Sequence, residues 1–150
     1  MTRWAVRRLG TGDREPARAL FALIADVFAE AHAPLGDAYL DGLLARQDFW
    51  AIAALRGDEI VGGLTAHTLP LTTAEAAEVF IYDIAVRADV QRQGAGRALI
   101  DALRSEARAH GIERVFVAAD DADAHALEFY RAVGGVASPV TMFVFDSAGD

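Results

Sequence analysis

The stretch "YDIAVRADVQRQGAGRALI", residues 82–100, joins an apolar, strand-like segment to a helix-like segment through a basic connection that ends in two glycines. Glycines at a helix start let backbone N–H groups approach a ligand, and the helix dipole favours an anion there. Arg92 and Arg97 add positive charge at the same place. The stretch is therefore a candidate phosphate cradle, and the alternative is a connection that needs glycine only for its turn.

Two common phosphate loops do not match this stretch. A dinucleotide-binding fingerprint places its glycines directly after a strand, with a third glycine three residues later. Here residues 87–93 separate the strand from the glycines, and Leu99 occupies the third position. A Walker loop requires a lysine followed by serine or threonine, which this stretch lacks.

The pattern on either side predicts a mixed α/β fold, in which amphipathic helices alternate with short apolar strands. We expect one domain over residues 1–150, because no linker, repeat or low-complexity segment interrupts the order. The turn at residues 56–59 predicts a hairpin, Gly111 is placed for a helix C-cap, and Gly134 and Gly135 end the last helix. The expected strands are residues 4–9, 49–55, 60–69, 78–86, 115–119 and 140–145, and the expected helices are residues 15–30, 39–47, 94–110 and 123–133.

Composition excludes several classes of function. The chain has 150 residues and no cysteine, so disulfides, thiolate metal sites and cysteine nucleophiles are excluded. A net charge of -8 disfavours nucleic acid and anionic membranes as partners and favours a cationic small molecule. The apolar runs are too short to span a bilayer, which predicts a cytoplasmic protein. The four histidines lack metal-ligand spacing, so no metal is assigned.

The glycine stretch resembles the acetyl-coenzyme A signature of the Gcn5-related N-acetyltransferases (GNAT), [Q/R]-x-x-G-x-[G/A], at Gln91, Gly94 and Gly96. A second family element, N-x-x-A-x-x-F-Y-x-x-x-G, is matched from Asp123 through Ala126 and "FY" to Gly134, with Asp in place of the usual Asn. The expected order of helices and strands is similar to the GNAT fold over nearly the whole chain.

A closer resemblance links "YLDGLLARQDFWAIAAL", "VGGLTAHTLP" and "FIYDIAV" to the small aminoglycoside 3-N-acetyltransferases. This resemblance implies acetyl transfer from acetyl-coenzyme A to the 3-amino group of a polycationic aminoglycoside, and a homodimer. The alternatives are another amine acceptor (a polyamine, a protein N-terminus or a lysine) and a non-catalytic acyl-coenzyme A sensor.

The family resemblance also implies which residues hold the coenzyme. The pyrophosphate is expected on the residues of a cofactor loop, and the pantetheine arm is expected beside the backbone of the preceding strand. Asp123, at the usual asparagine position, cannot donate a hydrogen bond when ionised, which puts one expected contact in question. The coenzyme set is the cofactor loop Gln91, Arg92, Gln93, Gly94, Ala95, Gly96, Arg97 and Ala98, the strand residues Ile84, Ala85 and Val86, and Asp123, Ala126 and Tyr130.

Catalysis requires an acid and a base. By family position Tyr130 donates a proton to the departing sulfur, and the alternative is a ring that only packs beside Phe129. Asp83 interrupts an apolar strand, where a carboxylate is costly unless it is paired or functional. Asp83 is therefore the first candidate base, with an ion pair to Arg87 as the alternative, and Glu78 is the second candidate.

Carboxylates are expected to line the acceptor side. Asp120, Asp121 and Asp123 follow a predicted strand, and such a cluster is also typical of a solvated loop and a helix N-cap. The acceptor-binding set is Glu78, Tyr82, Asp83, Asp120 and Asp121.

Overall fold

The chain divides into two compact units, Met1–Ala118 and Ala119–Asp150. The computed structural model describes residues 4–147. The first unit contains β1 (Ala5–Leu9), α1 (Arg14–Val27), α2 (Asp37–Ala45), β2 (Phe49–Arg56), β3 (Glu59–Pro70), β4 (Ala77–Val86), the 3-10 turn η1 (Ala88–Val90), α3 (Ala95–Ala109) and β5 (Val115–Val117). The second unit contains α4 (Ala124–Ala132), followed by an irregular segment. The predicted mixed α/β class is confirmed.

The five strands form one sheet in the order β1-β2-β3-β4-β5. The first four strands run antiparallel, and the predicted hairpin joins β2 to β3. The strand β5 pairs parallel with β4 through only three residues, Val79 to Ile81 of β4. Beyond Ile81, β4 is therefore paired with β3 alone among the strands of the described residues.

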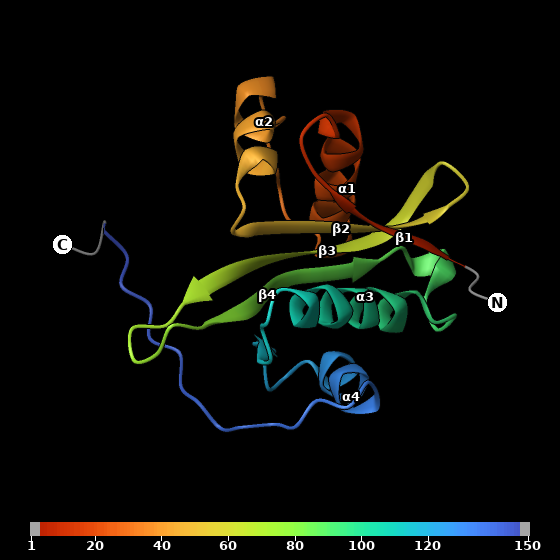
Figure 1. The fold of residues 1–150 in the computed structure, drawn as a ribbon. Coiled ribbons are helices and arrows are strands. Elements are labelled where there is room, and N and C mark those ends of the chain that lie inside the picture. The colour runs from red at the N-terminus through yellow and green to blue at the C-terminus, as the bar shows by residue number, and fades with distance from the viewer. Residues whose placement is uncertain (1–3, 148–150) are drawn as a thin grey trace. The chain divides into compact units, whose positions relative to one another are not determined.

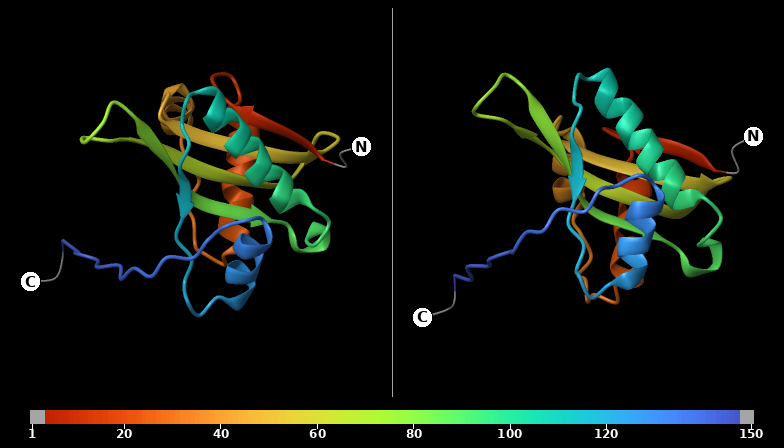
Figure 2. Two further views of the ribbon diagram at one scale, coloured as in Figure 1. Left: turned by 60° about the horizontal axis from the view of Figure 1, so that its bottom comes forward. Right: turned by 90° about the horizontal axis from the view of Figure 1, so that it is seen from below.

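Helices cover both faces of the sheet in the first unit. Figure 1 shows α1 and α2 on one face and α3 on the other, and the view from below in Figure 2 places α3 in front of the strands. The core between the sheet and α1 includes Leu20, which has no exposed surface. A Cβ at Gly63 would meet a methyl carbon of Leu20 at 2.3 Å and the carbonyl oxygen of Ile52 at 2.6 Å, so only glycine lets α1 pack this closely.

The first helix ends earlier than its sequence pattern predicts. The expectation was a helix to Glu30, but α1 ends at Val27, and Ala29 adopts a left-handed conformation with φ 53°. The N–H groups of Ala29 and Glu30 bond back to the carbonyls of Asp26 and Ala25, which completes a Schellman cap. The backbone thus reverses at an alanine, where helices usually use glycine.

The second unit ends its helix as predicted. Gly134 has φ 100°, and the N–H groups of Gly134 and Gly135 bond to the carbonyls of Arg131 and Tyr130. A Cβ at Gly135 would lie 2.9 Å from the Tyr130 carbonyl oxygen. The glycine of the second family element is therefore a helix cap, which no L-residue fills without strain. Gly111 caps α3 in the same way, with φ 76°.

The predicted last strand is wrong. Residues 140–145 have no regular secondary structure, and their apolar side chains are exposed, from 71% at Met142 to 94% at Phe145. The residue types favour a strand, but a strand also requires a partner backbone, and the described part of the second unit contains no strand. The strand predicted over residues 115–119 is also shorter, because β5 ends at Val117.

No helix among the described residues is both long and apolar enough to cross a membrane.

Candidate active site

The cofactor loop forms a left-handed turn that leads directly into α3. Gly94 is the N-cap of this helix with φ 92°, and Arg92 has φ 63°. Backbone N–H groups in turns of this kind, at the start of a helix, are a common setting for anion binding. Gly94 has no side chain that could cap the helix, so no carboxylate or hydroxyl at the N-cap position competes for the first-turn N–H groups.

The loop is tied to its surroundings by side-chain hydrogen bonds. The Gln91 amide donates to the Val86 carbonyl at 2.9 Å, which links the loop to the end of β4. The Trp4 indole N–H donates to the Gln93 carbonyl at 3.2 Å. Gln91 therefore has a structural function at the first position of the family signature, while Arg92 and Arg97 expose their side chains to solvent.

Within the described first unit the last residues of β4 have a backbone edge that no strand pairs with, on which Gln91 already bonds to the Val86 carbonyl. Ile84, Ala85 and Val86 pair with Leu64, Gly63 and Gly62 of β3. On the other side the β5 ladder has already ended at Ile81. An extended ligand can therefore bind along this edge as an added strand does.

A β-bulge in β4 changes which face its side chains occupy. Thr65 pairs with Asp83 and the next residue, Ala66, pairs with Ile81, which leaves Tyr82 as the extra residue. Tyr82 contacts the ring of His67, while Ala85 packs into the core below α1. The bulge therefore directs Tyr82 and Asp83, although adjacent in sequence, toward the same face of the sheet.

Asp83 is a partly buried carboxylate with a perturbed pKa. Burial, and secondly the negative charge of Glu30, raise the pKa of Asp83 above its ordinary value. Among residues 4–147 Asp83 forms no ion pair. The alternative ion pair to Arg87 is not found, because the Arg87 guanidinium contacts Asp89 at 2.6 Å and Glu59 at 3.2 Å.

Glu30 was missed by sequence reasoning. It follows α1 as an exposed residue, and nothing in its helical spacing distinguishes it from a solvent-facing glutamate. Only the packing of α1 across β4, together with the left-handed turn at Ala29, brings its charge within reach of Asp83. No sequence signal indicates this proximity.

The second candidate base is engaged by a cation. The Glu78 carboxylate lies 3.1 Å from the Arg114 guanidinium, and Arg114 in turn lies over the Phe116 ring at 6.0 Å. Arg114 thus already engages the Glu78 carboxylate, whereas Asp83 has no cation partner among residues 4–147. Asp83 is therefore the better placed of the two candidates to accept a proton.

In the second unit one of the three aspartates caps the helix α4. The Asp123 carboxylate accepts a hydrogen bond from the Ala126 N–H at 3.0 Å and is the N-cap of α4, which confirms that alternative. The Asp120 carboxylate accepts from the Ala122 N–H at 2.8 Å, and Asp121 is exposed. Tyr130, in the last turn of α4, is half-buried with its ring centroid 5.3 Å from that of Phe129.

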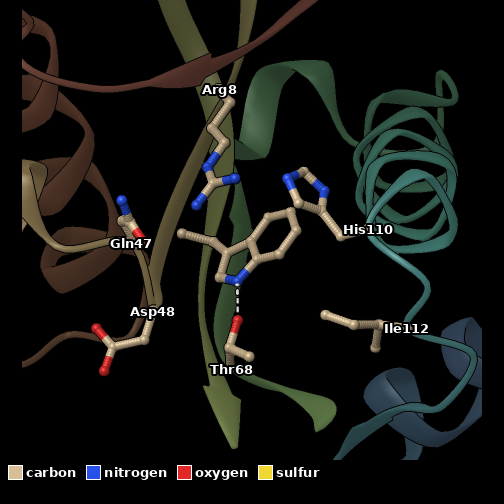
Figure 3. Close-up of a pocket in the computed structure, with 7 residues that line it drawn as sticks. Arg8, Gln47, Asp48, Thr68, His110 and Ile112 are labelled. Atoms are coloured by element: carbon tan, nitrogen blue, oxygen red, sulfur yellow. Dashed lines mark hydrogen bonds between the residues drawn. The ribbon is translucent and has the colours of Figure 1, made fainter. Parts of the chain in front are cut away.

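A separate pocket of about 600 Å³ lies near the C-terminal end of α3 and contains none of the predicted site residues. Figure 3 shows Arg8 and His110 in the upper part of the view, with Thr68 and Ile112 below them. The Trp50 indole donates to the Thr68 hydroxyl at 2.8 Å, and Arg8 donates to Glu106 and to the Phe49 carbonyl. The lining residues are Arg8, Gln47, Asp48, Trp50, Thr68, His110 and Ile112.

Residues 17–134 match the model of the acetyltransferase (GNAT) family. The fold is similar to that of the aminoglycoside acetyltransferase meta-AAC0020 from an uncultured soil metagenomic sample, solved in complex with sisomicin, with 33% identity, a TM-score of 0.93 and 96% of each chain covered. The same protein in complex with trehalose gives 34% identity and a TM-score of 0.91 over the same shares. HMB0005, an aminoglycoside acetyltransferase also from uncultured soil, is 32% identical with a TM-score of 0.92, covering 99% of this chain and 100% of that one. No curated protein matched the sequence.

Proposed function

Because this chain belongs to the acetyltransferase (GNAT) family, we propose that it transfers an acetyl group from acetyl-coenzyme A to the 3-amino group of an aminoglycoside. The observation that carries the proposal is the sequence identity of 32–34%, over nearly the whole chain, to two aminoglycoside acetyltransferases from soil metagenomic samples. The net charge of -8 supports a polycationic acceptor.

The residues present fit the coenzyme. The left-handed turn at Arg92 and Gly94 and the uncapped start of α3 suit a pyrophosphate, which the cofactor loop would hold through backbone N–H groups. The open edge of Ile84 to Val86 suits the amide-containing pantetheine arm. When bound, acetyl-coenzyme A supplies an activated acetyl thioester. Ala126 and Tyr130 belong to the same proposed binding set, whereas the Asp123 carboxylate is already used as a helix cap.

Asp83 is the proposed general base. A carboxylate whose pKa is raised by burial is a stronger proton acceptor than an exposed one, and Asp83 has no cation within the described residues to hold it in its charged form. It accepts the proton of the acceptor ammonium group, directly or through water. Tyr130 donates a proton to the departing sulfur, so that the leaving group departs as a thiol.

The acceptor side combines carboxylates and aromatic rings. Tyr82 and Asp83 share one face of the sheet, and the charge of Glu30 acts on the same carboxylate. Several carboxylates near one another favour a ligand with several ammonium groups. The proposed acceptor set is Glu78, Tyr82, Asp83, Asp120 and Asp121, and we add Glu30 to it because its charge acts on Asp83.

We extend the proposal to the biological role, the cellular location and the oligomeric state of the enzyme. Acetylation removes a positive charge from an antibiotic that acts as a polycation, so the expected outcome is resistance, in the cytoplasm where acetyl-coenzyme A is made. The exposed apolar residues Val136, Val140 and Met142 to Phe145 are a candidate surface for a homodimer, because monomers rarely expose so many neighbouring apolar side chains.

An amine panel tests the function. Release of free coenzyme A is followed with gentamicin, spermine and a lysine-containing peptide, and the acetylated nitrogen is located by NMR. Turnover of gentamicin with acetyl on the 3-amino nitrogen is expected. Turnover of the peptide alone would refute the aminoglycoside acceptor while leaving the acetyltransferase in place. No turnover of any amine, with acetyl-coenzyme A still bound, would favour the sensor alternative.

A further inference from the structure

A continuous row of aromatic rings runs from the core beneath α1 to the surface of β4. The ring centroids of Phe21 and Phe49 are 6.2 Å apart, those of Phe49 and His67 are 5.5 Å apart, and those of His67 and Tyr82 are 6.1 Å apart. Exposure rises from 8% at Phe49 to 64% at Tyr82. The outermost ring is therefore supported by rings that are anchored in the core.

A second row supports the same tyrosine from the side of β5. The Phe80 and Tyr82 centroids lie 6.1 Å apart, and the Phe80 and Phe116 centroids lie 5.0 Å apart. Tyr82 meets both His67 and Phe80 at an interplanar angle of 80°, the edge-to-face arrangement that aromatic pairs prefer. We name His67, Phe80, Tyr82 and Phe116 the aromatic shelf. Its Tyr82 ring is restrained on two sides and still exposes most of its surface.

The β-bulge gives this exposed ring a chemical partner. Because the bulge directs Tyr82 and Asp83 to one face, a flat apolar surface lies directly beside a partly buried carboxylate. A ligand that matches both carries an ammonium group next to a rigid ring with an apolar C–H face. Aminosugar and aminocyclitol rings have this combination, whereas a linear polyamine has the charge without the ring.

We propose that the aromatic shelf is the subsite for one aminosugar or aminocyclitol ring of the acceptor. Tyr82 contacts the C–H face of that ring, and Asp83 faces the ammonium group attached to it. This inference rests on the proposed function and deepens it. It assigns to Tyr82 the recognition of a ring in the acceptor, in addition to the recognition of its positive charge. Discrimination between aminoglycosides and linear polyamines then depends on Tyr82.

Three variants test the shelf: Tyr82→Ala removes the ring, Tyr82→Phe keeps the ring and removes the hydroxyl, and Tyr39→Ala is a control at a tyrosine on α2 that is 60% exposed. When a ligand ring covers one face of a tyrosine, the apolar area that is buried changes the affinity for that ligand about tenfold. We therefore expect KM for sisomicin to rise about tenfold in Tyr82→Ala and to stay within about twofold in Tyr82→Phe and Tyr39→Ala. KM for spermine should change less than about threefold in all three variants.

The outcomes separate this inference from the proposed function. If wild-type protein acetylates sisomicin and Tyr82→Ala has an unchanged KM for it, the proposal that the aromatic shelf is a ring subsite is overturned, while the proposed acetyltransferase function stands. An equal rise of KM for spermine and for sisomicin in Tyr82→Ala also overturns it, because the Tyr82 side chain would then recognise the positive charge of the ligand and not its ring. If wild-type protein acetylates no aminoglycoside, the proposed function fails, and calorimetric titration of sisomicin decides the shelf separately. Binding that weakens about tenfold in Tyr82→Ala supports it, and absent or unchanged binding overturns it.

Discussion

The carboxylate of Glu30, just beyond the end of α1, raises the pKa of Asp83 in the middle of β4, in addition to the larger effect of burial. Two residues more than 50 positions apart in the sequence thus share one electrostatic environment. If Asp83 is the base, its charge state determines the acidic limb of the rate profile.

Glu30→Gln should move that acidic limb. Removing a negative neighbour stabilises the ionised form of Asp83, so its pKa falls, and the limb of kcat/KM moves to lower pH by less than about one pH unit, because burial remains. The measurement is a pH profile of acetyl transfer, with Glu15→Gln on α1 as the control. A limb that stays in place would mean that Asp83 is not the group titrating.

Asp83→Asn should separate catalysis from stability. Loss of a general base lowers kcat by about 100-fold or more, whereas loss of a binding charge mainly raises KM. The stability effect has the opposite sign. A raised pKa means that the ionised carboxylate destabilises the fold above the folded-state pKa, and that this cost disappears below the unfolded-state pKa.

The variant should therefore unfold at a higher urea concentration than wild type at pH 7. The difference should shrink as the pH falls through the raised pKa and vanish near about pH 3, where Asp83 is protonated in both states. Urea titrations at the two pH values check this sign, and a variant that is less stable at pH 7 would contradict the burial of an unpaired charge.

Gly96→Glu should abolish coenzyme binding while the fold survives. The substitution adds bulk and negative charge in the first turn of α3, where the pyrophosphate is proposed to bind. Gly42→Glu on α2 is the control, because it adds the same charge at an exposed helical glycine with open space around its Cβ position. Calorimetry with acetyl-coenzyme A should show loss of affinity in the first variant only, and equal affinities would remove the pyrophosphate from this loop.

Tyr130→Phe should lower kcat by about 100-fold to 10,000-fold with little change in coenzyme affinity, because only the proton donor is lost. The Phe129 ring contact and the Gly134 cap do not involve the hydroxyl, so both should persist in the variant. A kcat within about threefold of wild type would assign Tyr130 to packing.

Ala29→Gly should stabilise the protein. Ala29 has φ 53° in the Schellman cap of α1, a conformation that costs an L-residue about 1 kcal/mol and glycine almost nothing. Part of this gain is offset by the greater freedom of glycine in the unfolded chain. We expect Tm to rise by about 2 °C, and Ala33→Gly, at an exposed alanine without positive φ, should give no gain. A lower Tm in Ala29→Gly would contradict the left-handed turn.

The amino-acid sequence by itself determined the features that depend on neighbouring residues. The hairpin of β2 and β3, the cap at Gly111 and the end of α4 at Gly134 follow from turn chemistry, because φ preferences and caps act within a few residues. The glycine turn at the start of α3 likewise follows from its glycines. The family signatures are local for the same reason, and the match to the GNAT model confirms the family that they indicate.

Tertiary structure alone decided the features that depend on distant backbone. The bulge at Tyr82 appears only in the register between β3 and β4, the charge of Glu30 reaches Asp83 only through the packing of α1, and Glu78 pairs with Arg114 only because β5 lies beside β4. Residues 140–145 illustrate the converse, since their strand-forming side chains do not make a strand where the described unit offers no partner backbone. Strand pairing, ion pairs and pKa values depend on which surfaces the fold brings together, and periodicity along the chain carries no information about that.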